Sequence, residues 1–275
     1  MPESETLDRE RLLDTAVAAA RAGGEVLMQY LREGVRMRNK SSEGGKSYDL
    51  VSDADIDSEK AIANLIRSRH PTHDLLGEEA LSLDDTNVAD LWIIDPLDGT
   101  NNYAHRVPQF SVSIAYYHQG LATVAAVLNP ARDELFTATR GGGAFCNDTP
   151  AHVSDASSLS ETLIGCGFYY DRGDMMRSTL SSIEDLFGHH IHGIRRFGSA
   201  ALDLCSVGCG QFGGYFEYQL SPWDFAAGRL FVEEAGGKVS TARGDDLPLA
   251  SSSVLASNGR LHNDLLSITS RHHPQ

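Results

Sequence analysis

Four short apolar segments in residues 110–146 constrain the fold more than any other part of the sequence. They read FSVSIAYY, LATVAAVL, ELFTATR and AFC, and the stretches HQG, NPARD and GGG connect them. β-Branched and aromatic residues favour strands, and short connections rich in Gly, Asn and Asp favour tight turns. The region is therefore predicted to form an antiparallel meander.

Helical and strand patterns alternate in the rest of the chain. Apolar spacing predicts one helix over 7–32 and another that begins at 52 or 53 and ends before Pro71. Further helices are expected from Ser199 and Asp224, each as N-cap, and short strands at 91–95, 161–168 and 213–218. This mixture, with much antiparallel pairing, indicates an α+β layered fold rather than a doubly wound parallel sheet.

Composition and charge limit the classes of function. The 275 residues are 41% hydrophobic and 22% charged, which is typical of a globular protein with a sizeable core. The formal net charge of −15 repels nucleic-acid backbones, so no nucleic-acid partner is expected. A phosphorylated metabolite stays compatible, because bound divalent cations invert the local sign of charge.

The cysteines and the N-terminal sequence indicate a cytoplasmic protein. None of the four cysteines forms a C-x-x-C pair, and buried thiols in a reducing compartment account for them. The N-terminal stretch MPESETLDRERLL is acidic and has no apolar signal core. No apolar stretch is long enough to span a membrane, so no membrane partner is expected.

The stretch WIIDPLDGTNNYAHR, residues 92–106, begins as an apolar strand and ends as a polar turn with two acids. Asp95 and Asp98 would repel each other unless a cation lay between them. The box contributes only oxygen ligands, which favours Mg²⁺ or Mn²⁺ over Zn²⁺. Gly99 would let the backbone approach a ligand, and Thr100 adds a hydroxyl. Taken on its own, however, the box is more typical of a plain Asp/Gly turn than of a metal site.

Other acids stand at the ends of predicted elements. They are Glu78 and Glu79 in HDLLGEEA, Asp224 in SPWDFAAG, and Asp49, Asp53, Asp55 and Asp57 in DLVSDADIDSEK. Each has an ordinary explanation, either as a solvated acid or as a helix cap. Taken together, they favour a Mg²⁺ site with an anion-binding turn, but residue types and spacing leave the two interpretations open.

Three blocks, in order along the chain, resemble the inositol monophosphatase family of Mg²⁺-dependent, lithium-sensitive phosphatases. They are GEE, then WIIDPLDGTNNYAHRVPQFSVSIA, then GSAALDLCSVGCGQFGGYFEYQLSPWDFAAGRLFVEEAGGKV. The resemblance covers about residues 10–265. It implies a layered αβαβα sandwich of the sugar-phosphatase type and a homodimer. One structural unit would combine an N-terminal α+β subdomain, 1–147, with a C-terminal α/β subdomain, 148–275.

The resemblance also implies roles for individual residues. Asp55 and Thr100 would orient and deprotonate the attacking water, and the Gly99 and Thr100 N–H groups would hold the phosphate. Two or three Mg²⁺ ions would be bound by four carboxylates and one backbone carbonyl. The carboxylates are those of Glu78, Asp95, Asp98 and Asp224, and the carbonyl is that of Leu97. The substrate would contact Glu217, Ser199 and Ala200. The family has a basic residue shortly before DLVSDAD, and Lys40 and Lys46 are the candidates here.

The implied reaction is hydrolysis of a small phosphomonoester by metal-assisted in-line attack of water, with no phosphoenzyme. The predicted substrate is myo-inositol monophosphate. Histidinol phosphatase, fructose bisphosphatase and phosphoadenosine phosphate phosphatase are the alternatives within the superfamily. A non-catalytic metal- or ligand-binding module is the alternative from another class. The intact set of acids argues against such a module.

Overall fold

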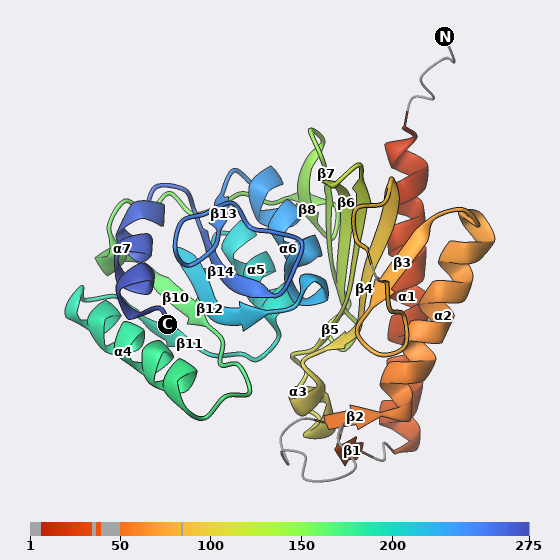
Figure 1. Cartoon of the computed structure of the whole chain (residues 1–275), viewed down its shortest axis with the longest axis horizontal. Helices are drawn as coiled ribbons and strands as arrows, with labels where there is room; N and C mark the ends of the chain where they lie inside the picture. Colours follow the sequence, from red (N-terminus) through yellow and green to blue (C-terminus); the bar gives the residue numbers. More distant parts are fainter. Residues whose placement is uncertain (1–6, 35–36, 40–49, 84, 275) are drawn as a thin grey trace.

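The protein folds into five alternating layers of helices and sheets, as the computed structural model shows (Figure 1). The structure describes residues 7–34, 37–39, 50–83 and 85–274, with side chains described outside 37–39 and 50–52. Lys40 and Lys46 lie outside the described residues. No helix in the described ranges is long and apolar enough to cross a membrane.

A seven-stranded sheet in the order β3-β4-β5-β6-β7-β8-β9 forms the second layer. Its strands are β3 (Asp74–Gly77), β4 (Asp90–Asp98), β5 (Ser111–His118), β6 (Leu121–Asn129), β7 (Glu134–Thr139), β8 (Gly143–Cys146) and β9 (Thr149–Pro150). Only β3 and β4 pair in parallel, and every later pair is antiparallel. The meander predicted over 110–146 is confirmed.

Helices α1 (Arg9–Glu33) and α2 (Asp53–Arg69) cover one face of this sheet. Small residues on α1, among them Ala16 and Ala20, let it approach the sheet closely. Trp92 and Tyr116 are fully buried beneath the helices. The short strands β1 (Met37–Asn39) and β2 (Leu50–Ser52) pair with each other beside α3 (Thr100–Ala104) (Figure 1).

Helices α5 (Ala200–Gly208) and α6 (Pro222–Glu234) form the middle layer and contact both sheets. Ala226, Ala227 and Phe231 pack toward the first sheet, whereas Leu204 and Phe225 pack toward the second. Both helices are therefore largely apolar around their circumference, as expected for helices buried on two sides.

The second sheet has five strands in the order β11-β10-β12-β14-β13. They are β10 (Leu163–Cys166), β11 (Gly193–Arg195), β12 (Gly214–Leu220), β13 (Lys238–Ser240) and β14 (Ser252–Ser257). β10 pairs in parallel with both its neighbours, and β14 is antiparallel to both of its own. A 3₁₀ turn, η1 (Leu159–Glu161), precedes this sheet.

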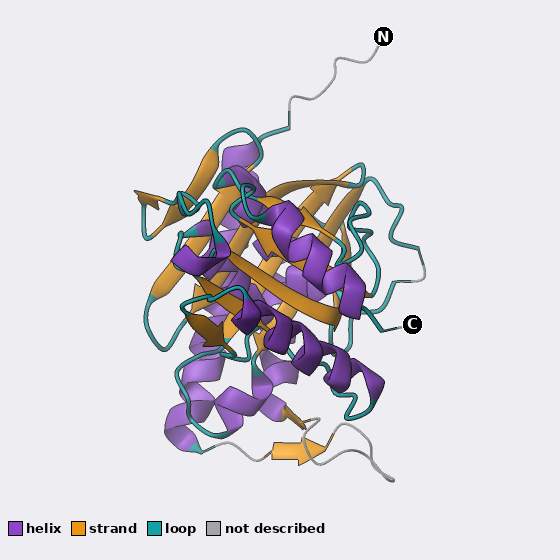
Figure 2. Cartoon of the chain, turned by 90° about the vertical axis from the view of Figure 1, so that its left-hand side faces the viewer, coloured by secondary structure: helices purple, strands orange, loops and turns teal. Residues whose placement is uncertain are grey.

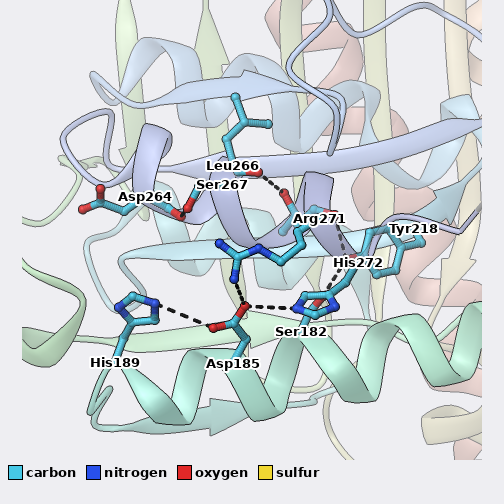
Figure 3. Close-up of polar contacts among 10 residues, drawn as sticks. Ser182, Asp185, His189, Tyr218, Asp264, Leu266, Ser267, Arg271 and His272 are labelled. Carbon is cyan, nitrogen blue, oxygen red and sulfur yellow. Dashed lines mark hydrogen bonds and ion pairs between the residues drawn. The ribbon is translucent and has the colours of Figure 1, made fainter.

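Helices α4 (Asp174–Gly188) and α7 (His262–His272) close the outer face of the second sheet, and Figure 2 shows helices lying in front of strands on this side. Asp185 of α4 links the two helices. It accepts from Arg271 Nη1 at 2.8 Å and lies 3.0 Å from His272 Nε2 (Figure 3). These contacts hold the C-terminal helix against the body of the protein.

The layered α+β prediction is confirmed, and most predicted elements are present within two or three residues. The N-cap of α6 was predicted wrongly: Ser221 is the N-cap, and Asp224 is the third helical residue of a capping box. The stretch 147–160, which follows the meander, contains β9 and the start of η1. The subdomain boundary after 147 stays a prediction.

Candidate active site

A β-bulge places Asp95 and Asp98 at the end of β4. Asp95 pairs with Ser113 and Asp98 with Ser111, so three steps along β4 match two along β5. In a regular strand, residues three apart point to opposite faces, and a bulge re-aims the second side chain. Pro96 occupies the bulge, where a missing N–H donor costs nothing to the ladder. Both carboxylates line one cleft as a result.

The glycine and threonine after the bulge begin the short helix α3. Gly99 has φ +93°, and a side chain there would meet Gln109 O at 3.0 Å and Gly198 O at 3.2 Å. Only glycine suits this left-handed, crowded position. Thr100 Oγ1 donates to Leu97 O at 3.1 Å, which ties the helix start to the bulge.

The start of α5 holds Asp98 from the other side of the cleft. Ser199 Oγ donates to Asp98 Oδ2 at 2.6 Å, and the Ala201 N–H donates to the same oxygen at 2.8 Å. Ser199 is fully buried and is also the N-cap of α5, as predicted. One serine therefore both begins a helix and orients a carboxylate contributed by the other sheet.

Glu59 of α2 fixes the segment that carries Glu78. Its two carboxylate oxygens accept from Glu79 N at 3.0 Å and from Ala80 N at 2.7 Å. A Cβ on Gly77 would lie 2.2 Å from Glu59 Oε1, so glycine is needed for this close approach. The GEE sequence thus reflects a buried clamp as well as a half-buried acid that lines the cleft.

Asp224 and Glu217 come from the second sheet and its helices. Asp224 Oδ2 accepts from the Ser221 N–H at 2.7 Å, the capping-box bond of α6. Glu217 lies on β12, and Tyr215 OH donates to its Oε2 at 2.6 Å. Both acids lie close to the first-sheet carboxylates because α5 and α6 connect the two sheets.

Ten of the eleven predicted site residues line a single cleft of about 290 Å³. They are Glu78, Asp95, Leu97, Asp98, Gly99, Thr100, Ser199, Ala200, Glu217 and Asp224. Asp55 is the exception: it is fully buried in the first turn of α2, where its charge adds to burial in raising the pKa of Tyr103 in α3. Asp55 therefore lies near the helix that Thr100 begins but is not part of the cleft lining. The predicted Asp55–Thr100 pair stays a prediction.

Burial and mutual repulsion raise the pKa values of the clustered acids. The pKa of Asp95 is raised well above its usual value by burial and then by the charges of Glu78, Asp98 and Asp224. Burial raises the pKa of Asp98 to about 6, even though the Ser199 and Ala201 bonds act in the opposite direction. Burial likewise raises the pKa of Asp224 well above its usual value and that of Glu217 to about 7.

The carboxylates offer the donor chemistry of a hard divalent cation. Glu78 and Asp95 are within hydrogen-bond reach of each other, an arrangement that requires a shared proton or a cation. All side-chain donors are oxygens, as Mg²⁺ prefers. In the described part of the chain, no three His, Cys, Asp or Glu side chains already converge on a common point. The acids therefore fit a metal in type and proximity.

Several residues of the site were not predicted from the sequence. Glu59 looks like an ordinary helical acid, and only its contacts with the GEE segment reveal its role. Asp203, Arg196 and Tyr215 also line the cleft. Asp203 and Tyr215 belong to the GSAALD and GGYFEY stretches of the sequence. A polar residue among apolar ones in these stretches was the sequence signal that could have identified them as site residues.

Known proteins match almost the whole chain. The model of the inositol monophosphatase family matches residues 8–274. An inositol-1-monophosphatase of Rhizobium meliloti is 39% identical over 96% of this chain and 97% of its own length. The Nus factor SuhB of Pseudomonas aeruginosa is also 39% identical, over 96% of this chain and 97% of its own.

Solved structures agree with the sequence comparison. The inositol monophosphatase of Anabaena (Nostoc) sp. superposes with a TM-score of 0.83 at 40% identity, covering 95% of this chain and 96% of its own. An IMPase/NADP phosphatase complexed with Mg²⁺ and phosphate has a TM-score of 0.83 at 27% identity, covering 94% and 95%. The chain therefore belongs to the inositol monophosphatase family, whose members are Mg²⁺-dependent phosphatases.

Proposed function

We propose that this protein hydrolyses a small phosphomonoester, with myo-inositol monophosphate as its main substrate. The observation that carries the proposal is the single cleft lined by five acids: Glu78, Asp95, Asp98, Asp224 and Glu217. Its volume of about 290 Å³ suits a small metabolite rather than a polymer. The resemblance between the GGYFEY–PWD stretch and inositol phosphatases supports the choice of leaving group.

Four of these acids would hold two or three Mg²⁺ ions, with Mn²⁺ as an alternative. Glu78, Asp95 and the Leu97 carbonyl form one set of ligands, and Asp95, Asp98 and Asp224 form another. The Leu97 carbonyl has two lone pairs, so its bond from Thr100 leaves one for a metal. When bound, the ions supply charge neutralisation and activation of water.

The remaining residues would position water, phosphate and alcohol. Asp55 and Thr100 orient the attacking water and accept its proton, and the N–H groups of Gly99 and Thr100 bind phosphate oxygens. Glu217, with Ser199 and Ala200, contacts the leaving alcohol. Phosphoryl transfer depends on positioning and charge neutralisation, which a cleft of fixed acids and amides can provide.

A phosphate-release assay with Mg²⁺ across four substrates tests the proposal. The substrates are myo-inositol monophosphate, histidinol phosphate, fructose bisphosphate and phosphoadenosine phosphate. We expect the highest kcat/KM for inositol monophosphate. A preference for any other would replace the proposed substrate, and no release from any of the four would favour the non-catalytic binding module.

A purely protein-binding role is the second candidate, since a relative of equal identity is a Nus factor. The clustered buried acids favour catalysis, because a protein without metal chemistry gains nothing from their repulsion. We also propose a cytoplasmic homodimer inhibited by lithium. A staphylococcal inositol monophosphatase-1, 27% identical over 96% of both chains with a TM-score of 0.84, has been obtained as a LiCl-soaked inhibitory complex. Sedimentation velocity tests the dimer, and LiCl titration of phosphate release tests the inhibition.

A further inference from the structure

Asp203 is a buried carboxyl group in the cleft that the proposed roles leave unassigned. It lies in α5, one turn after Ser199, and is 1% exposed. The Gly198 N–H bonds to the carboxyl group, but Oδ1 has no hydrogen-bond partner among the described residues. A buried oxygen without a partner is costly unless a ligand or water satisfies it.

Asp203 lies near both a proposed metal ligand and a proposed substrate contact. The charges that most raise its pKa, after burial, are those of Asp98 first and Glu217 second. Arg196, which also lines the cleft, stabilises the ionised forms of both Asp203 and Glu217. Asp203 and Glu217 therefore form a pair of acids beyond Asp98, with one arginine near both.

We propose that Asp203 is a specificity-determining residue that, beside Glu217, hydrogen-bonds to hydroxyl groups of the polyol part of the substrate. The inference rests on the proposed function and deepens it. Two neighbouring carboxyl groups can each accept from one of two adjacent hydroxyls on a cyclitol or sugar ring. A leaving group without hydroxyls would leave the buried Asp203 Oδ1 without a hydrogen-bond partner, which a site of this kind rejects strongly.

A structural role for Asp203 makes a different prediction. If the side chain only supported α5, its loss would disturb Asp98 through the start of that helix and would weaken phosphate binding as well. If it contacts the polyol, its loss weakens binding of the whole substrate and leaves inorganic phosphate unaffected. The two roles are separated by comparing these ligands in one enzyme.

The test uses Asp203→Leu, with Ser206→Ala as the matched control. Leucine keeps the branched shape of the side chain and loses both oxygens. Ser206 lies on the same helix, its hydroxyl donates to Leu202 O at 2.9 Å, and it is not part of the cleft lining. Steady-state assays with Mg²⁺ give KM and kcat for myo-inositol monophosphate and Ki for inorganic phosphate as a competitive inhibitor.

We expect Asp203→Leu to raise KM by about 10- to 100-fold, the range for a lost hydrogen bond to a charged group. Ki for phosphate should stay within about twofold, and Ser206→Ala should change neither. Equal losses for substrate and phosphate, or no change in KM, would overturn the inference while leaving the proposed function intact. A wild-type protein that releases no phosphate would refute both.

If Asp203→Leu does not fold, the isosteric Asp203→Asn carries the test. Its amide keeps a neutral hydrogen bond, so KM should rise by about fivefold with Ki for phosphate unchanged. An unchanged KM in this variant would also overturn the inference.

Discussion

Replacing Ser199 with alanine removes a helix cap and a carboxylate donor together. The cap of α5 is worth about 1 kcal/mol, and a hydrogen bond to a charged group about 1.5–3 kcal/mol. Ser199 is fully buried and its Oγ lies 2.6 Å from Asp98 Oδ2, so alanine removes a buried donor to this carboxylate. We therefore expect Ser199→Ala to lower the free energy of unfolding by about 2–4 kcal/mol at pH 8.

The loss should depend on pH in a defined direction. Burial raises the pKa of Asp98 to about 6 in the folded protein, from 3.8 when exposed. Ionised Asp98 therefore destabilises the metal-free fold as pH rises through this range, and its donors matter most above pH 6. Ser199→Ala should cost about 1 kcal/mol more at pH 8 than at pH 5, where folded Asp98 is protonated.

Urea unfolding with a chelator present, at both pH values, measures these differences. Ser199→Gly is the matched variant, because glycine caps a helix nearly as well as serine but donates nothing to Asp98. It should lose about 1.5–3 kcal/mol, slightly less than alanine. A loss below about 0.5 kcal/mol for Ser199→Ala, or equal losses at pH 5 and pH 8, would refute the reasoning.

Two further substitutions test the supports of the site and of the C-terminal layer. Gly77→Ala places a Cβ 2.2 Å from Glu59 Oε1, so Glu59 must move and release the backbone of the GEE segment. The Mg²⁺ concentration for half-maximal phosphate release should then rise several-fold. An unchanged value would contradict the role of Glu59 as a clamp. Asp185→Ala removes the partner of Arg271 and His272 on α7 and should cost about 0.5–1.5 kcal/mol in urea unfolding. Because the hydrogen bond from His272 and the charges of Arg271 and His272 lower the pKa of Asp185, the cost should begin to fall only below about pH 3.8 and vanish as pH drops below the lowered pKa of the folded protein. It should also fall in high salt, and a constant cost would contradict the account.

Local sequence patterns predicted the elements well and their tertiary assembly less well. The meander and α1 could be predicted because their periodicity and turn residues are local properties. Asp224 illustrates the limit: an acid at a helix start is a common N-cap, but Ser221 takes that place here because Pro222 is the first helical residue. Helices α4 and α7 went unpredicted, since their burial depends on the second sheet.

The candidate site shows the same difference between local patterns, which the sequence reveals, and tertiary contacts, which it does not. The box at 92–106 alone favoured a plain turn over a metal site, because the bulge that turns Asp98 toward Asp95 cannot be read from the sequence. Glu59 and Asp203 were missed, since contacts between distant segments define them. Resemblance to a family supplied the roles of the other acids, and the cleft brings those acids together.

The central claim is that the acids at the end of β4 bind the metal that catalyses phosphate release. Asp95→Asn tests it most directly, because the change removes one negative charge at almost constant volume. We expect Mg²⁺-dependent phosphate release from myo-inositol monophosphate to be abolished, while the variant still unfolds cooperatively and at a temperature no lower than the metal-free wild type. Undiminished turnover in a folded Asp95→Asn protein would contradict the account.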